Sequence, residues 1–378
     1  MPIFREIASP PASNDMTARL WNVSSPFGQP ISLRSSSQPT KLRLWDLRAE
    51  PPAASQISGD ELDVGAGRVF SPNGKWLATL SNPAKFVHLL NLTTSPPSEH
   101  LLLHPGIASP VFSPDGRWLA TGGGDATIKL WDLTSPDPTA GSKPLHGHRG
   151  AIRSLAFSAD GHRLISGAQE PLARVWDLTA PNPSAKPQIL DGGGGASIVR
   201  TVAISPDGRY VLTGSWEPDF AARVWDLSLP DSASKPIKLS FKGRVFDSAF
   251  SVDGRWAAAG SWDQTAQLLD LTKPGAKPFV LQGHTARTLS VAFSPDNRWL
   301  ATGNEDRTAR LWSLTADDPS ADSVRLTEPY GLGVSFSPDG RLLALSQTEY
   351  RSIPFSPDGS SFASSDADAE LYNVRWGI

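Results

Sequence analysis

A histidine, a threonine and an aspartate follow one another in an order that could support hydrolytic chemistry. They are His284, Thr302 and Asp306, and Trp312 closes the same segment. In a hydrolytic triad a histidine takes a proton from a hydroxyl nucleophile while a carboxylate orients the histidine. The elements that carry these residues decide whether the set is catalytic or structural.

This segment is one copy of an internal repeat. Each copy reads as a strand, a Ser-Pro-Asp-Gly turn, a second strand, a Gly/Asp turn and a third strand. Proline fixes φ at the first turn position, and glycine accepts the positive φ that follows. A proline-rich connection then leads to a short fourth strand, as at 235–239 and 277–281. The copies lie at 69–92, 111–133, 155–178, 202–227, 248–271 and 291–314.

Composition agrees with a chain of short strands joined by turns. The 378 residues include 32 glycines and 34 prolines, which punctuate turns, and 39% are hydrophobic. A formal net charge of −3 gives no basic balance for nucleic acid or an anionic membrane. The absence of cysteine excludes disulfides, thiolate metal sites and a cysteine nucleophile. Without a signal peptide or a membrane-length apolar run, we expect a cytoplasmic protein.

The repeat resembles the WD-repeat (β-propeller) family, and its near-identical tandem copies are similar to those of bacterial members. The resemblance rests on the closing Trp-Asp, the turn aspartate and the Gly-His pairs 147–148 and 283–284. It implies an all-β fold in which four-stranded antiparallel blades surround an axis. We expect one domain over 1–378, with six complete repeats within about 67–326.

The termini carry partial repeats, at 1–60 and 332–378. The first holds two outer hairpins and the second two inner hairpins, so composites of the two would close a ring of eight blades. The strand at 369–374 is left over and competes with 40–47 for a third-strand place. A seven-bladed ring closed by 353–374 is the alternative, and a truncated copy of a longer array is another.

The resemblance also implies that His284, Thr302, Asp306 and Trp312 form a structural tetrad. The set is diluted in other copies, which argues against catalysis. His148, Ser166 and Trp176 lack the aspartate, and Thr121, Asp125 and Trp131 lack a clear histidine. In 248–271 we expect Arg244 to replace the histidine.

Two tryptophans and four arginines make the candidate binding site. Trp216 and Trp262 stand in Gly-Ser-Trp at turns that, in the family, face the top rim. Exposed aromatic and arginine side chains are typical hot spots of protein interfaces. The arginines that precede or begin first strands are Arg153, Arg200, Arg244 and Arg287.

The sequence therefore favours a non-enzymatic, monomeric scaffold that binds proteins or peptides on the top rim. It gives no cofactor or metal motif, and we expect neither nucleic-acid nor membrane binding. The alternative is a propeller enzyme, or the propeller of a peptidase or of a bacterial signalling protein. Catalysis would require charged residues converging on the axis, whereas the first strands read as packing material.

Overall fold

A computed structural model describes fourteen segments of the chain, which hold all the strands named below. They are residues 17–20, 31–34, 42–46, 53–56, 67–80, 86–94, 97–105, 108–192, 198–229, 235–273, 275–327, 333–346, 354–365 and 369–373. Every regular element in these residues is a β-strand, which confirms the all-β prediction.

Six sheets have four antiparallel strands each, which confirms the predicted sheet type. Their strands pair in chain order, so each sheet is a meander. The first three sheets are β5 (Val69–Phe70), β6 (Trp76–Leu80), β7 (Phe86–Asn91), β8 (Ser98–Leu103); β9 (Val111–Phe112), β10 (Trp118–Gly122), β11 (Ile128–Asp132), β12 (Lys143–Leu145); and β13 (Ile152–Phe157), β14 (Arg163–Ala168), β15 (Leu172–Asp177), β16 (Gln188–Asp191).

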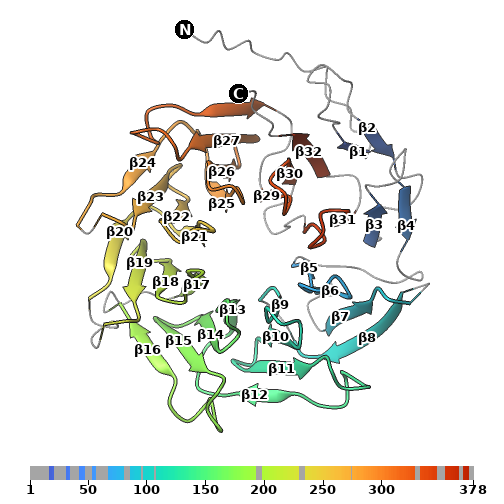
Figure 1. The fold of residues 1–378 in the computed structure, drawn as a ribbon. Coiled ribbons are helices and arrows are strands. Elements are labelled where there is room, and N and C mark those ends of the chain that lie inside the picture. The colour runs from blue at the N-terminus through green and yellow to red at the C-terminus, as the bar shows by residue number, and fades with distance from the viewer. Residues whose placement is uncertain are drawn as a thin grey trace.

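The next three sheets have the same order. They are β17 (Val199–Ile204), β18 (Tyr210–Ser215), β19 (Ala221–Asp226), β20 (Ile237–Ser240); β21 (Val245–Phe250), β22 (Trp256–Ser261), β23 (Ala266–Asp270), β24 (Phe279–Leu281); and β25 (Thr288–Phe293), β26 (Trp299–Asn304), β27 (Thr308–Ser313), β28 (Val324–Thr327). The sheets lie around a central axis, with the first strand of each innermost and the fourth outermost (Figure 1).

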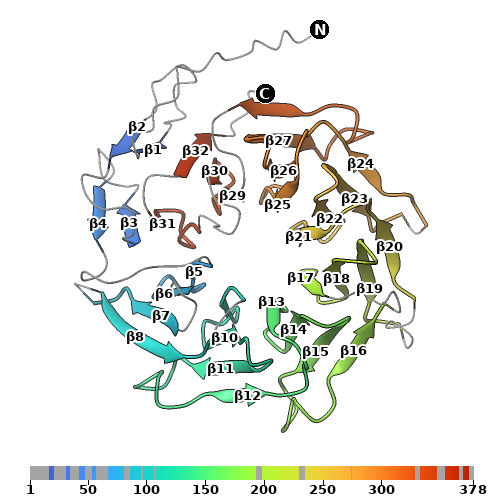
Figure 2. The same cartoon turned by 180° about the vertical axis from the view of Figure 1, so that it is seen from behind.

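The remaining strands come from both ends of the chain, which lie on the same side of the molecule (Figure 2). One sheet has the order β31 (Ser361–Ser365), β3 (Leu42–Asp46), β4 (Ala53–Gln56). The other has the order β2 (Ile31–Arg34), β1 (Thr17–Leu20), β32 (Ala369–Asn373), β30 (Leu342–Ser346), β29 (Gly333–Phe336).

The prediction for the leftover strand is wrong. β32 does not compete with β3, because it pairs antiparallel with β30 along five residues, including Ala344 opposite Leu371. β1 then pairs parallel with β32, at Arg19–Glu370 and Leu20–Leu371. This sheet consequently has five strands and one parallel pair, in place of four antiparallel strands.

Apolar side chains from neighbouring sheets pack together and form the core. In one cluster Val245 and Leu212 meet Ala257 and Leu269, so that β17–β20 is joined to β21–β24. One β-sheet cannot cover both of its own faces, so each sheet depends on its two neighbours. This packing gives the loops at the sheet ends a fixed frame.

The Ser-Pro-Asp-Gly turns repeat one hydrogen-bond scheme. At 251–256, Ser251 Oγ donates to Asp253 Oδ1 at 2.5 Å and accepts from the Trp256 backbone amide at 2.9 Å. Gly254 follows with φ of 72°, and Asn297 takes the equivalent place with φ of 58°. The turn therefore depends on a residue that tolerates the left-handed region, as its sequence predicts.

Candidate functional site

The two ends of each sheet carry different residues. The start of the first strand and the turn between the second and third strands share one end, as Thr288 opposite Asn304 shows. We call this end the upper rim. The Ser-Pro-Asp-Gly turn and the end of the third strand share the other end, as Trp299 opposite Ser313 shows. All six predicted binding residues lie on the upper rim.

A β-bulge shapes the upper rim at four successive sheets. The register shifts between Ile152 and Ser154, Val199 and Thr201, Val245 and Asp247, and Thr288 and Ser290. The bulged residues are Arg153, Arg200, Phe246 and Leu289. Arg244 and Arg287 precede the strand instead, so the four predicted arginines occupy two different positions of the repeat. A bulge re-aims its side chain, and the bulged residue is arginine in the first two of these sheets and apolar in the next two.

Arginine and tryptophan side chains alternate across three neighbouring sheets. The Arg244 guanidinium lies 4.6 Å from the centre of the Trp216 ring and 4.7 Å from that of Trp262. The Arg287 guanidinium also lies over the Trp262 ring, 4.2 Å from its centre. The two tryptophan rings are 6.0 Å apart. We call Trp216, Arg244, Trp262 and Arg287 the rim stack.

Phe246 extends the rim stack toward Arg200. Its ring stacks on Trp262 at 6.0 Å, and the Arg200 guanidinium lies 4.8 Å from its centre. Sequence reasoning missed Phe246, because only the bulge turns this residue of the first strand toward the rim. Arg153 is apart from this group, since its Nη2 donates to Gln169 Oε1 at 3.0 Å.

Carboxylates accompany both stacked arginines. Arg244 donates to Glu217 Oε1 from Nε at 2.7 Å and contacts the same oxygen through Nη2 at 2.6 Å. The hydrogen bond from Arg244 lowers the pKa of Glu217. Arg287 Nη1 lies 3.3 Å from Glu305 Oε1, and its side chain is 49% exposed. The rim stack thus offers aromatic and cationic surface with its acidic partners in place.

One carboxylate lies on a first strand, where the sequence suggested packing material. Asp247 accepts hydrogen bonds from the Val291 amide at 2.9 Å and the Ser248 amide at 2.8 Å. Burial raises the pKa of Asp247 above its ordinary value. Ser290 holds the equivalent position in the next sheet and accepts from Val334 in the same way. Asp247 therefore joins two inner strands. General acid–base catalysis at this place would require a second charged group that converges on Asp247.

The four residues of the expected tetrad are hydrogen-bonded in series. His284 Nδ1 lies 3.0 Å from Asp306 Oδ2, and its Nε2 lies 2.8 Å from Thr302 Oγ1. Trp312 Nε1 donates to that same hydroxyl at 3.0 Å. Thr302 is fully buried and Trp312 nearly so, and burial lowers the pKa of His284. A hydroxyl enclosed in this way has no access to a substrate, so the set links strands.

Two tetrads that looked incomplete have their missing members. Glu170 stands in for the absent aspartate, with Oε1 2.5 Å from His148 Nδ1 and a further bond from Arg174. His104 Nδ1 lies 2.7 Å from Thr121 Oγ1, and its Nε2 lies 3.5 Å from Asp125. The expectation of a missing histidine is therefore wrong, whereas the aspartate is absent as expected and Glu170 takes its place.

The expectation for Arg244 in the histidine place is also wrong. Val245 and Thr288 are equivalent, so counting back from these strands aligns Arg244 with Arg287 and Phe241 with His284. Phe241 is buried, and its amide donates to the Phe220 carbonyl at 2.9 Å. Arg244 is thereby free of any tetrad role and belongs to the rim.

Comparison with known families agrees with this geometry. The family model described as WD domain, G-beta repeat matches residues 100–132, 142–177, 187–226, 235–270 and 275–313. The chain belongs to the WD-repeat family. Each matched WD repeat begins on the outer strand of one sheet and ends on the third strand of the next, as β12 to β15 illustrate. No curated protein matches the sequence significantly.

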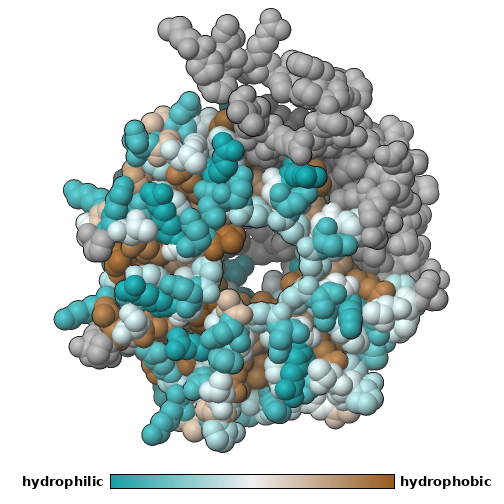
Figure 3. Space-filling model, viewed as in Figure 1, coloured by the Kyte–Doolittle hydropathy of each residue, from teal (hydrophilic) through white to brown (hydrophobic). Residues whose placement is uncertain are grey.

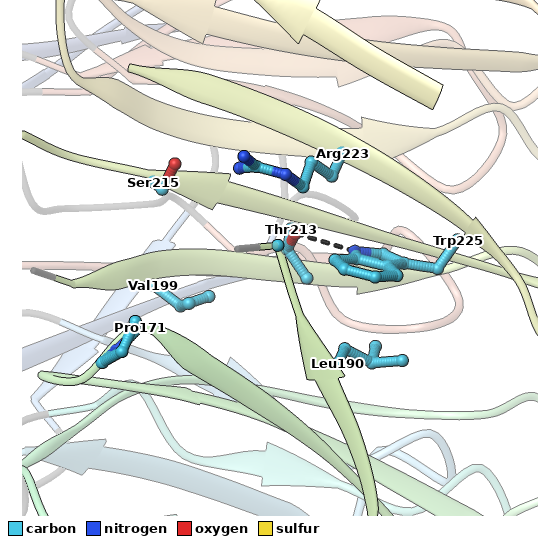
Figure 4. A pocket seen from close by; sticks show the side chains of 8 residues that line it. Pro171, Leu190, Val199, Thr213, Ser215, Arg223 and Trp225 are labelled. Carbon is cyan, nitrogen blue, oxygen red and sulfur yellow. Dashed lines mark hydrogen bonds between the residues drawn. The ribbon is translucent and has the colours of Figure 1, made fainter. Parts of the chain in front are cut away.

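A small cavity lies beside the tryptophan–threonine bond of one WD repeat. Trp225 Nε1 still donates to Thr213 Oγ1 at 3.0 Å. A cavity of about 10 Å³, lined by Thr213, Ser215, Arg223 and Trp225 among others, lies beside this bond (Figure 4). That volume admits about one water molecule. It is too small for an organic substrate.

The described residues give no sign of a metal or membrane site. No group of three or more histidine or acidic side chains among them could hold a metal ion. Nor does this part of the chain contain a helix long and apolar enough to span a membrane. The face drawn in Figure 3 is largely hydrophilic and is hollowed at its centre.

Proposed function

We propose that this WD-repeat protein is a non-enzymatic scaffold that binds protein or peptide partners through the rim stack. WD repeats generally mediate interactions between proteins, which is consistent with such a role. The observation that carries the proposal is the alternation of Trp216, Arg244, Trp262 and Arg287 across three sheets. Aromatic and arginine side chains that remain accessible supply most of the energy in protein interfaces.

The packed sheets support this role by keeping the rim in place. Loops fixed on a rigid frame lose little conformational freedom when a partner binds. Tetrads on both sides of the rim stack hold their strands with buried hydrogen bonds. The proposal includes no catalysis, because the three triad-like sets described above all have their hydroxyl enclosed.

The proposal also includes a closed ring of eight blades. Pairing of β3 with β31, and of β1 with β32, supports it, because each joins the two ends of the chain. A closed ring would leave few exposed sheet edges and would keep the rim rigid. The seven-bladed alternative uses a single N-terminal strand.

Affinity capture with purified wild-type protein and the Trp216→Ala/Trp262→Ala variant tests the binding role. We expect the variant to lose partners that wild type retains, at a melting temperature that still shows a folded chain. A Trp118→Ala variant is the control, because Trp118 lies on the opposite rim and also carries a stacked arginine, Arg117 at 4.9 Å. Equal capture by all three proteins would contradict the proposal.

A further inference from the structure

We infer that Trp216, Trp262 and Glu217 form a binding cage for a guanidinium group, which Arg244 occupies as an internal ligand. An arginine side chain of a partner peptide takes the place of Arg244 when it binds. This inference rests on the proposed rim function and names the partner's chemistry.

The cage has the parts that a guanidinium requires. The Arg244 guanidinium lies 4.6 and 4.7 Å from the two indole ring centres, which are 6.0 Å apart and form two sides of a corner. One carboxylate oxygen of Glu217 accepts from Nε at 2.7 Å. A planar, weakly hydrated guanidinium stacks on aromatic rings while its edge donates to a carboxylate. Lysine meets these requirements less well, because its ammonium is compact and strongly hydrated.

An arginine fits better than an acidic side chain. Both arginines of the rim stack already have a carboxylate, Glu217 for Arg244 and Glu305 for Arg287. An acidic partner would have to displace these neighbours, whereas a cationic partner can use Glu217 as it stands. The formal net charge of −3 also favours approach of a cationic peptide.

The walls of the cage are held independently of the Arg244 side chain. Trp216 Nε1 donates to the Val245 carbonyl at 3.1 Å, and Trp262 stacks on Phe246. The Trp262 amide bonds to the backbone carbonyl of Arg244 at 3.0 Å, a contact that persists if only the side chain moves. Removing the Arg244 side chain should therefore leave the cage open and folded.

The occupied cage is also easy to open. The side chains of Arg244 and Glu217 are 32% and 45% exposed, so their ion pair is screened by solvent. Trp262 Nε1 is enclosed without a hydrogen-bond partner while Arg244 is in place. An enclosed donor without an acceptor is unfavourable, and a peptide carbonyl that reached it would satisfy it.

The Arg244→Ala variant tests the inference. The probe is a blocked tripeptide, acetyl-Gly-Arg-Gly-amide, titrated with tryptophan fluorescence as the readout; its lysine and glutamate counterparts serve as comparisons. We expect Arg244→Ala to bind the arginine peptide at least about tenfold more tightly than wild type, which corresponds to about 1.4 kcal/mol. The lysine peptide should bind more weakly, and adding Glu217→Gln should remove the gain.

Arg255→Ala is the matched control. Arg255 lies over one ring only, Trp256 at 4.5 Å, and pairs with Asp270, so its removal opens no two-walled cage. If Arg244→Ala has a lower melting temperature than wild type, the Arg244→Gln variant is used to repeat the test. The inference is overturned if neither Arg244 variant gains affinity for the arginine peptide. It is also overturned if the wild type binds the glutamate peptide and Arg244→Ala abolishes that binding. Neither outcome would exclude partner binding at the rim, because the capture experiment tests partner binding separately.

Discussion

His284 Nε2 lies 2.8 Å from Thr302 Oγ1, and this contact sits at the centre of the best-formed tetrad. Removing the imidazole takes one buried hydrogen-bond partner from Asp306 and one from Thr302, while Trp312 still donates to the Thr302 hydroxyl. We expect His284→Ala to lower the free energy of unfolding by about 1–3 kcal/mol. Thermal or urea unfolding measures this, with Thr285→Ala as the control, because only the Thr285 backbone amide bonds to Asp306.

A catalytic role for His284 predicts the opposite outcome. It would be supported if the variant melted at the wild-type temperature and lost a hydrolytic activity that wild type shows. The structural interpretation requires lost stability and no lost chemistry.

Stability should fall in mild acid because buried histidines are neutral. Burial lowers the pKa of His148 to about 4, and it lowers those of His104 and His284 too. Between about pH 6.5 and 4 the unfolded chain binds more protons, so the stabilisation is complete above pH 6.5 and is lost as pH falls toward 4. For His148 alone the full effect is on the order of 3 kcal/mol.

Melting temperatures measured from pH 7.5 to 4.5 check this prediction. A His148→Gln variant should show a shallower decline than wild type. His146→Gln should not, because His146 is exposed two residues away. Parallel profiles for wild type and His148→Gln would contradict the account.

The left-handed turn position gives a test of local backbone strain. At Gly254, an added Cβ would meet only ordinary contacts, the nearest being Pro206 Cδ at 3.8 Å. Gly254→Ala should therefore cost only the strain of its φ, about 1 kcal/mol. Gly254→Asn should cost less, because Asn297 adopts the same conformation in the next sheet. If urea unfolding showed the Gly254→Asn variant to be less stable than the Gly254→Ala variant, this explanation would be contradicted.

A disulfide can test the closure between the two ends of the chain. Leu44 lies opposite Ala363 in the pair of β3 with β31, and the chain has no cysteine of its own. We expect Leu44→Cys/Ala363→Cys to crosslink on mild oxidation and to raise the melting temperature. Leu44→Cys/Leu371→Cys should stay reduced, because β32 pairs with β30 instead. No crosslink in the first double variant, or equal crosslinking in both, would contradict this pairing of the chain ends.

The repeated parts of the fold were predictable because each copy carries its own local signals. The turn residue at Gly254 and the tryptophan at Trp312 have counterparts in the other copies, so the structure of one copy predicts that of the next. The place of β32 was not predictable, because a short strand can pair with any free edge. The partial repeats did indicate that the two ends pair, as β3 and β31 do, but they did not determine which third strand joins which inner hairpin.

The site was partly predictable for a similar reason. Tryptophan and arginine types pointed to the rim, but their contacts depend on which residue a bulge turns outward, as Phe246 shows. His104 escaped notice because it precedes Pro105-Gly106 and lacks the preceding glycine of the Gly-His pairs. Glu170 follows His148 by 22 residues, as Asp306 follows His284, so the spacing of the repeat could have pointed to its carboxylate.

Truncation of one arginine on each rim tests the central claim most directly. Arg287 and Arg117 are 49% and 50% exposed, each lies over a tryptophan, and each pairs with a carboxylate. Arg287→Ala and Arg117→Ala should therefore change stability by similar, small amounts. Partner capture, quantified beside wild type, is predicted to fall at least about tenfold for Arg287→Ala, the equivalent of about 1.4 kcal/mol, and to stay unchanged for Arg117→Ala. Capture that is unchanged by Arg287→Ala, or lost only with Arg117→Ala, would contradict binding at the rim stack.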